Sequence, residues 1–349
     1  MFLKKNFFLF LISGILFALP SCKDDDPIDL PEDPTTYEDG IFIINQGPFQ
    51  NGTGTISFYS RESGLMADNI FQKANDGEEL GNIVQSMTIY NDLVYIVVNN
   101  SNKIVIANAT SFEKVGEITN FELPRYFLPV GDDKAFVSQW GSDGVTGSIK
   151  VIDLNTNTIS NTIDTRPGPE SMIKVDDFVY VTNLGGFTTD SVISKIDIAT
   201  ETVLSSIEVG LRPVSIVLDK NGDLWTISEG DYNTLDNGAL SKISNDNLEL
   251  SLATPYSFVD LTINTSGDML YYVTGGMTYQ HAITDTALTS SPLISRYFFK
   301  LGVDSQTDEL MALDAKGFSQ NGQMLIYNSD GTALDSIDVG VAPGGFWFD

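Results

Sequence analysis

The most regular feature of this chain is an alternation of short hydrophobic segments and polar turns from Ser86 onward. Segments such as "KAFVSQW" and "GSIKVIDL" follow an alternating apolar–polar pattern, and Asn, Asp and Gly residues separate them. This pattern is typical of half-buried β-strands joined by tight turns. Four strands recur in each unit of about 40–45 residues, as in a β-propeller blade. The sequence therefore predicts an all-β fold of repeated blades, whose four strands we denote a, b, c and d.

The two ends of this region predict how the ring of blades closes. The segments "GIFIINQ", "TGTISFYS" and "LMADNIFQ" match strands b, c and d with no a-strand before them, whereas "GFWFD" at the C-terminus matches an a-strand with no blade after it. Together they complete one blade, in which Phe346 and Phe348 should be buried beside residues 40–46. Residues 40–349 then form a single seven-bladed propeller of about 44 residues per blade. Only the sixth blade, in residues 277–295, is irregular.

The N-terminus predicts export and lipid attachment. Lys4 and Lys5 precede a short apolar run, and the junction "LPSC" ends at Cys22. Residues 1–21 are therefore interpreted as a lipoprotein signal peptide and Cys22 as the lipidated residue, with an ordinary cleaved export signal as the alternative. Residues 22–39 are rich in acid and Pro, which is typical of an extended tether. The acidic run after Cys22 resembles a surface-export signal, although it could simply keep the tether solvated.

Composition narrows the classes of partner and of chemistry. Cys22 is the single cysteine, so disulfides, thiolate metal sites and a cysteine nucleophile are excluded. The formal charge is −28, and removal of Lys4 and Lys5 with the signal peptide makes it −30. Such a chain repels phosphate backbones, so we expect no nucleic-acid partner. We expect a lipid-anchored protein on the outer membrane that is a monomer once released.

Two further motifs carry a resemblance to a known family. "YVTN" at Tyr180–Asn183 is followed by "SKIDIATETVLSSIEVGLRP". With the "LPSC" start and the "GVAPGGFWF" ending, the chain resembles the YVTN-repeat, YncE-like surface lipoproteins of Gram-negative bacteria. One branch of that family, the BtuG type, captures cobalamin and sits over a TonB-dependent transporter. The resemblance therefore implies capture of a bulky nutrient, with a corrinoid as the first candidate, and a transporter as partner.

The propeller topology sorts the connections into two faces. The b–c loops and the d–a junctions emerge on one face, which we call the loop face, and the a–b and c–d turns form the opposite turn face. Four of the five arginines lie at or beside d–a junctions, close to the central axis. They could converge on a ligand, because Arg suits carboxylates, phosphates and amide oxygens, or each could pair with an acid such as Glu122 or Glu170. These arginines are Arg125, Arg166, Arg212 and Arg296.

The predicted b–c loops carry aromatic residues among Gly and Asn. Exposed rings in this setting suit an apolar or planar ligand, although some could fold beneath their own loops. We expect two or three to be accessible. The candidates are Phe49, Trp140, Phe187, Tyr232, Tyr279 and Phe318.

Signals for catalysis are weak. No nucleophile elbow, zinc-protease motif or phosphate-binding glycine loop is present. The single histidine, His281, is expected at the surface. Glu229 and Asp231 form the one acid pair on the loop face that is a candidate for catalysis. The segment Asp219–Asp223 is expected to be a turn rather than a calcium loop. The sequence thus favours a binding protein without metal or cofactor. A propeller enzyme of lactonase or lyase type and a protein- or glycan-binding scaffold remain alternatives.

Overall fold

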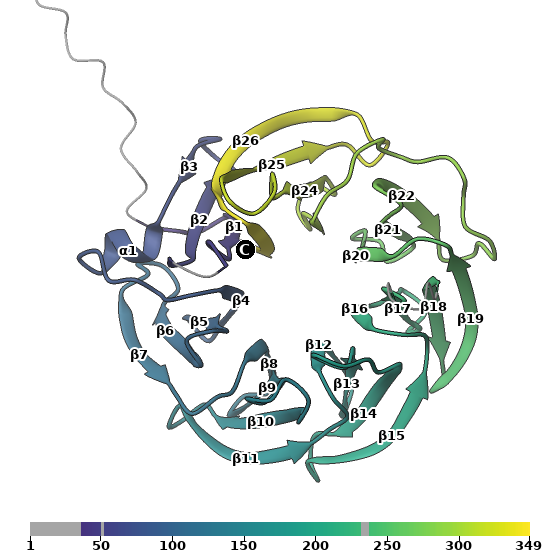
Figure 1. Ribbon diagram of the computed structural model, residues 1–349. Helices are drawn as coiled ribbons and strands as arrows, with labels where there is room; N and C mark the ends of the chain where they lie inside the picture. The colour runs from purple at the N-terminus through teal and green to yellow at the C-terminus, as the bar shows by residue number, and fades with distance from the viewer. Residues whose placement is uncertain (1–35, 50–51, 232–236) are drawn as a thin grey trace, which may run out of the picture. The chain divides into compact units, whose positions relative to one another are not determined.

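The computed structural model describes residues 36–349 except 50–51 and 232–236, and its strands surround a central axis (Figure 1). Cys22, the predicted signal peptide and most of the predicted tether lie outside the described residues. Within the described part, no helix is long and apolar enough to cross a membrane.

The fold is an all-β, seven-bladed propeller, which confirms the predicted fold class. Six of the seven sheets have four antiparallel strands, and the sheet of the sixth blade has three. The first blade contains β27 (Pro343–Phe348), β1 (Gly40–Asn45), β2 (Thr55–Ser60) and β3 (Met66–Ala67); the second β4 (Val84–Tyr90), β5 (Leu93–Val98), β6 (Lys103–Asn108) and β7 (Lys114–Ile118); and the third β8 (Pro124–Gly131), β9 (Lys134–Gln139), β10 (Ser148–Asp153) and β11 (Thr158–Asp164).

The remaining blades follow the same order from the axis outward. The fourth contains β12 (Pro169–Val175), β13 (Phe178–Asn183), β14 (Val192–Asp197) and β15 (Thr202–Glu208); the fifth β16 (Pro213–Leu218), β17 (Leu224–Ser228), β18 (Gly238–Ser244) and β19 (Asn247–Thr254); the sixth β20 (Phe258–Ile263), β21 (Met269–Thr274) and β22 (Met277–Ala282); and the seventh β23 (Lys300–Val303), β24 (Leu310–Asp314), β25 (Asn321–Tyr327) and β26 (Ala333–Val341).

The hydrophobic core lies between neighbouring blades. The b and c strands are mostly buried, whereas a d-strand such as β15 is exposed along nearly its whole length. One core cluster joins Phe136 and Val151 of the third blade to Val179 and Val181 of the fourth. Because each blade buries its faces against its neighbours, closing the ring also buries the outer faces of the first and last blades.

Closure occurs as predicted. β27 pairs antiparallel with β1, and the C-terminus lies beside β1 (Figure 1). In this pairing Trp347 is opposite Phe42. Phe346 and Phe348 pack against the core between the first and seventh blades, whereas Trp347 packs against the second blade's side. All three rings are partly buried, and Phe346 and Phe348 bury against the seventh blade as well as the first, whereas burial within the first blade was expected.

Two blades depart from the predicted strand pattern, and one of them lacks its fourth strand. In the first blade β3 has two residues, and the predicted d-strand ends in the short helix α1 (Ile70–Ala74). In the sixth blade the described residues after β22 form no fourth strand, and a single bridge joins Thr278 to Ile294. The irregular sequence of the sixth blade agrees with its missing strand, whereas the short d-strand of the first blade was not anticipated.

The turn face follows the repeat closely. Asn91 and Asp92 both adopt left-handed backbone conformations, as a two-residue hairpin requires. The carboxylate of Asp219 accepts hydrogen bonds from the amides of Asn221 and Asp223 and from the indole of Trp225. The segment Asp219–Asp223 is therefore a turn, as expected.

Candidate functional site

The loop face is fixed by hydrogen bonds between each junction and the loop beside it. In the fifth blade the amides of Glu229 and Gly230 donate to the carbonyls of Arg212 and Leu211, both at 3.0 Å. The third, fourth and first blades repeat this pair of bonds. In the "YVTN" motif, the Asn183 amide group also donates to a junction carbonyl, that of Arg166, at 2.9 Å. Loops and junctions are therefore held together before any ligand arrives.

Arg212 occupies a strained position in its junction. Its φ of 59° is left-handed, and the equivalent residue of the preceding junction is Gly168, with a φ of 61°. A non-glycine residue in this region costs of order 1 kcal/mol or more, and such residues cluster at functional sites. The side chain at this position is therefore of interest for function.

A cavity of about 210 Å³ opens at the axis on this face and gathers charged and aromatic side chains. Arg125 and Arg212 both line it, so two of the four junction arginines meet at this cavity. Its lining also includes Tyr126, Trp140, Glu170, Glu229, Asp260 and Lys300.

Arg125 is held by a bidentate ion pair. Its Nε and Nη2 donate to the two carboxylate oxygens of Glu170 at 2.8 and 2.6 Å, and Nη1 donates to Gln85 at 2.7 Å. Trp140 donates its indole N–H to Glu170 and places its ring 4.4 Å from the guanidinium carbon. Burial lowers the pKa of Arg125 but Glu170 raises it further, so the net pKa lies above its ordinary value. The Arg125 guanidinium therefore stays charged, and all three of its nitrogens donate hydrogen bonds.

The second arginine of the cavity is paired more loosely. Arg212 Nε donates to Glu229 at 2.9 Å and Nη1 donates to the Thr188 carbonyl at 3.0 Å. Burial raises the pKa of the Glu229 carboxyl above its ordinary value, although Arg212 opposes that shift. Asp231, the other acid of the candidate pair, lies two residues after Glu229 in the loop between β17 and β18 and is not among the cavity residues.

The inner part of the cavity holds a third ion pair. Lys300 Nζ donates to Asp260 at 2.8 Å, and the same carboxylate accepts bonds from the Ser215 hydroxyl and the Leu301 amide. Burial raises the pKa of Tyr126, which lines the same space. The three cationic side chains of the cavity thus face three carboxylates, and their formal charges cancel.

The other two junction arginines do not line the cavity. Arg166 pairs with Asp190, and about half of its side chain is exposed. Arg296 pairs with Asp314. Pairing with acids and convergence therefore both occur, and the predicted partner Glu170 is correct for Arg125. Glu122 instead accepts a hydrogen bond from the Ser142 amide.

The predicted loop aromatics differ in their exposure to solvent. Phe49 and Phe187 are the most exposed, at 71% and 69%, and Phe318 is exposed at 43%. Phe187 contacts the Trp140 ring edge to face, with centroids 5.9 Å apart. Tyr232 lies outside the described residues.

Two predictions in the sixth blade are wrong. Tyr279 lies within β22 rather than in a loop, and its ring stacks on Tyr272. His281 is in the same strand and is buried against Trp225, not at the surface. The hairpin between β21 and β22 turns through Gly275 and Gly276, so the strand begins earlier than the pattern indicated. Among the described residues, no group of three or more His, Cys, Asp and Glu side chains is arranged to hold a metal ion.

Sequence analysis missed several residues of this face. Tyr126, Asp260 and Lys300 lie just inside the a-strands, and that shared position next to the axis was the available signal. Tyr256 and Tyr297 are exposed in the connections that enter the sixth and seventh blades, where arginines were the predicted site residues.

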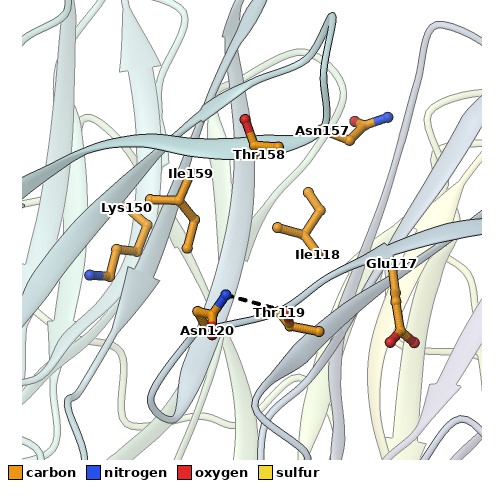
Figure 2. A pocket seen from close by; sticks show the side chains of 8 residues that line it. All are labelled: Glu117, Ile118, Thr119, Asn120, Lys150, Asn157, Thr158 and Ile159. Atoms are coloured by element: carbon orange, nitrogen blue, oxygen red, sulfur yellow. Dashed lines mark hydrogen bonds between the residues drawn. The ribbon is translucent and has the colours of Figure 1, made fainter.

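A larger cavity of about 480 Å³ lies elsewhere, on the outer wall between β7 and β11 (Figure 2). Ile118 and Ile159 line it beside Thr119 and Asn120, and none of its lining residues is aromatic. The Asn120 amide donates to the Thr119 hydroxyl within it. It is an open groove between two neighbouring d-strands. Its charged lining residues are Glu117, which pairs with Lys103 and Lys114, and Lys150, so it does not gather several ion pairs as the central cavity does.

Comparisons with solved structures identify other propellers. A quinonprotein alcohol dehydrogenase-like protein from Bacteroides thetaiotaomicron is 17% identical with a TM-score of 0.69, and the match covers 90% of this chain and 79% of that one. A candidate 6-phosphogluconolactonase from Bacteroides fragilis is 12% identical with a TM-score of 0.65, covering 91% of this chain and all of that one. At these identities the likeness shows the fold alone.

Comparisons by sequence give one family. No curated protein matches the sequence significantly. The family described as Domain of unknown function (DUF5074) matches residues 39–348, which span the whole propeller. The chain belongs to this family.

Proposed function

We propose that the protein is a binding protein of the cell surface that captures a bulky nutrient on its loop face and passes it to a TonB-dependent transporter. The observation that carries the proposal is the distribution of exposed aromatic side chains. Among the described residues, every one of them is in a b–c loop or a d–a junction. They are Phe49, Phe187, Tyr256, Tyr297 and Phe318.

Three of these rings are held in place. Phe187 lies over the backbone of Gly144 and against Trp140. Tyr256 lies over Gly275, and Phe318 contacts Phe299 edge to face at 4.9 Å. Rings that are ordered before binding lose little conformational freedom when a ligand covers them. This arrangement favours an apolar or planar ligand broad enough to span several loops.

The central cavity supplies the polar part of the site. Its volume of about 210 Å³ admits a protruding group, so the bulk of a large ligand would rest on the rings. Because its charges are already paired, a neutral ligand with amide oxygens suits it better than a polyanion. Arg125 and Arg212 offer further N–H groups for such oxygens.

A corrinoid is the first candidate ligand, and this step rests on the resemblance to BtuG-type propellers. Its peripheral amides match the arginine donors, and its apolar edges match the rings. Titration calorimetry with cyanocobalamin tests the proposal. Tight binding is expected, and Trp140→Ala and Arg212→Gly should each weaken it by about 1–3 kcal/mol.

The controls separate site from fold. Arg212→Gly suits the left-handed backbone, so a loss of affinity reports the side chain alone. Asp330→Ala, on the turn face, should leave affinity unchanged. Absence of heat and of a visible-absorbance change at high micromolar ligand would remove corrinoids, whereas tight binding unaffected by both variants would refute this site.

An enzyme is the second candidate, because the raised pKa of Glu229 suits proton transfer at the cavity. A sugar lactone such as 6-phosphogluconolactone is the substrate to test, since one similar structure carries that activity in its name. Hydrolysis followed by pH-stat that disappears in Glu229→Gln would favour catalysis. No rate above the uncatalysed reaction would favour binding alone.

The location is tested separately. Cys22→Ala should release the protein from the membrane fraction if Cys22 carries the lipid. Protease added to intact cells should digest the wild-type protein if it faces outward. Full protection would place it inside the cell.

A further inference from the structure

The sixth blade leaves one edge of its outer strand open. Figure 1 shows the chain leaving β22 in a long irregular segment where other blades add an outer strand. Thr278 exchanges two backbone hydrogen bonds with Ile294, at 3.0 and 3.1 Å. In that register Gln280 would pair with residue 292, which is a proline. Proline has no N–H to donate to the Gln280 carbonyl, so the chain's own outer strand stops there.

The open edge exposes specific backbone groups. Residues 278, 280 and 282 alternate along β22, so the N–H and C=O of Gln280 and the N–H of Ala282 point outward like those of Thr278. No backbone hydrogen bond to these three groups occurs within the part of the chain that the structure describes. An unpaired edge of this kind is a template for an added strand.

A cavity of about 420 Å³ lies beside this edge. Gln280 and Ala282 form one wall and Pro292 and Leu293 another. At about 3.3 Å per residue, an extended segment of three residues needs roughly 10 Å of edge. The cavity therefore occupies the position of a missing strand rather than that of a globular ligand.

Charge narrows the choice of occupant. Asp285 and Asp330 line the cavity, and neither forms an ion pair among the described residues. A second copy of this chain, with a net charge of −28, would bring more acid to the edge. The chain's own residues 23–35 are likewise acidic and carry three prolines, which disfavour strand pairing.

We propose that the edge of β22 binds an extended segment of a partner polypeptide with basic side chains, which completes the sixth blade as its fourth strand. Backbone hydrogen bonds to Gln280 and Ala282 supply affinity, and Asp285 and Asp330 select lysine or arginine. This binding site is independent of the loop face.

Amide hydrogen exchange of the purified full chain tests the open edge first. The amides of Gln280 and Ala282 should exchange quickly, while those of Tyr279 and His281, which bond β21, should be protected. Protection of Gln280 in the free chain that is lost on removing residues 1–35 would show that the chain fills its own edge. Protection that rises with protein concentration would show a second copy. Either result would overturn the partner assignment.

Binding is tested with a fluorescent hexapeptide of alternating Val and Lys. It should raise anisotropy and slow exchange at Gln280 and Ala282, and replacing its Lys by Glu should abolish both effects. Gln280→Pro removes an outward N–H without a ladder bond and should weaken binding about tenfold. Gln280→Ala keeps the backbone and is the matched control. No binding at millimolar peptide, or equal binding to both variants, would refute the proposal.

A substitution of the stopping residue gives a second, opposite test. Pro292→Thr restores the N–H that faces Gln280, so the chain's own segment should extend its pairing and protect the Gln280 amide. The peptide should then fail to bind, while the unfolding temperature stays the same or rises. Undiminished peptide binding to a Pro292→Thr protein with a protected Gln280 amide would show that the peptide binds elsewhere.

Discussion

The loop face and the turn face are built from connections between the same strands, yet their chemistry differs. Lysines on the turn face join neighbouring blades, and the pairs Lys134–Glu201, Lys195–Asp246 and Lys220–Asp268 repeat the same direction around the ring. On the loop face the ion pairs of Arg125, Arg212 and Lys300 instead gather at the axis. The turn face therefore repeats one structural solution, whereas the loop face departs from the repeat where a ligand could bind.

Exposed apolar side chains show the same difference. Among the described residues, Leu65 is the only large apolar side chain that is exposed on the turn face. Others lie along the outer d-strands or on the loop face, where Val145 and Met277 add to the exposed rings. Tight hairpins demand Asn, Asp and Gly and leave little room for other residues. The longer b–c loops carry no such demand, so their composition is free to serve binding.

The largest effect on stability should come from β27, the C-terminal strand that closes the ring. Deleting Gly345–Asp349 removes most of β27 and the rings of Phe346, Trp347 and Phe348. We expect a loss of roughly 5 kcal/mol of unfolding free energy, because three large rings each lose part of their burial. Urea unfolding measures this loss, and an unchanged midpoint would contradict closure of the ring through β27.

The next largest effect concerns the ion pairs of the two faces, compared by the unfolding free energy lost when one pair is removed from each. Glu170→Gln leaves Arg125 buried with one fewer charge partner and should cost about 3 kcal/mol. Asp268→Asn removes a turn-face pair in which both side chains are largely exposed, and it should cost less than about 1 kcal/mol. Equal costs in chemical denaturation would mean that the axis pairs are no more buried in solution than the turn-face pairs.

Matched glycine variants separate ring placement from backbone strain. Gly144 and Gly222 both have positive φ, so Ala at either position should cost about 1 kcal/mol. At Gly144 the new Cβ would also overlap the Phe187 ring, whereas Gly222 faces open space. Gly144→Ala should therefore weaken ligand binding while Gly222→Ala does not. Titration calorimetry with cyanocobalamin measures both affinities, and equal affinities for the two variants would remove Phe187 from the site.

The smallest effect concerns pH and belongs to neither face. Burial lowers the pKa of His281 below its ordinary 6.5, and no residue that the structure describes forms a hydrogen bond with its Nε2. Above pH 6.5 both folded and unfolded states hold it neutral; below, the unfolded state takes the proton first and stability falls. The wild type should lose up to about 1 kcal/mol more than His281→Gln between pH 7 and 5.5. Parallel losses in the two proteins would contradict a buried neutral His281.

The fold was predictable because the same pattern of strands and turns recurs along the chain. Strand alternation and turn residues located most strands, and the orphan strand at "GFWFD" located the closure. Tyr279 and His281 were misplaced because the glycine pair before them makes a shorter turn than the other b–c loops. A pattern of alternating residues cannot distinguish a strand end from a loop when both contain apolar residues.

The site was predictable only in part. Junction position brought Arg125 and Arg212 to the axis, but Arg166 occupies the same type of junction and remains outside the cavity. Which arginine turns inward depends on its acid partner, and the pairing of Arg125 with Glu170 spans two blades. Such contacts between distant segments carry no local sequence signal.

The closure has one more consequence. The Asp39 amide donates to the Asp349 carboxylate at 2.8 Å, and Arg61 donates to the Asp349 main-chain oxygen at 2.9 Å. The first and last residues of the propeller therefore meet at one point on the turn face. A short linker between them would make the covalent order of the blades cyclic, so a circular permutant opened instead at the Asn155–Asn157 turn would keep the same ring. A peptide tag fused directly to Asp349 would, by contrast, compete with this junction, and a tag in the Asn155–Asn157 turn would not.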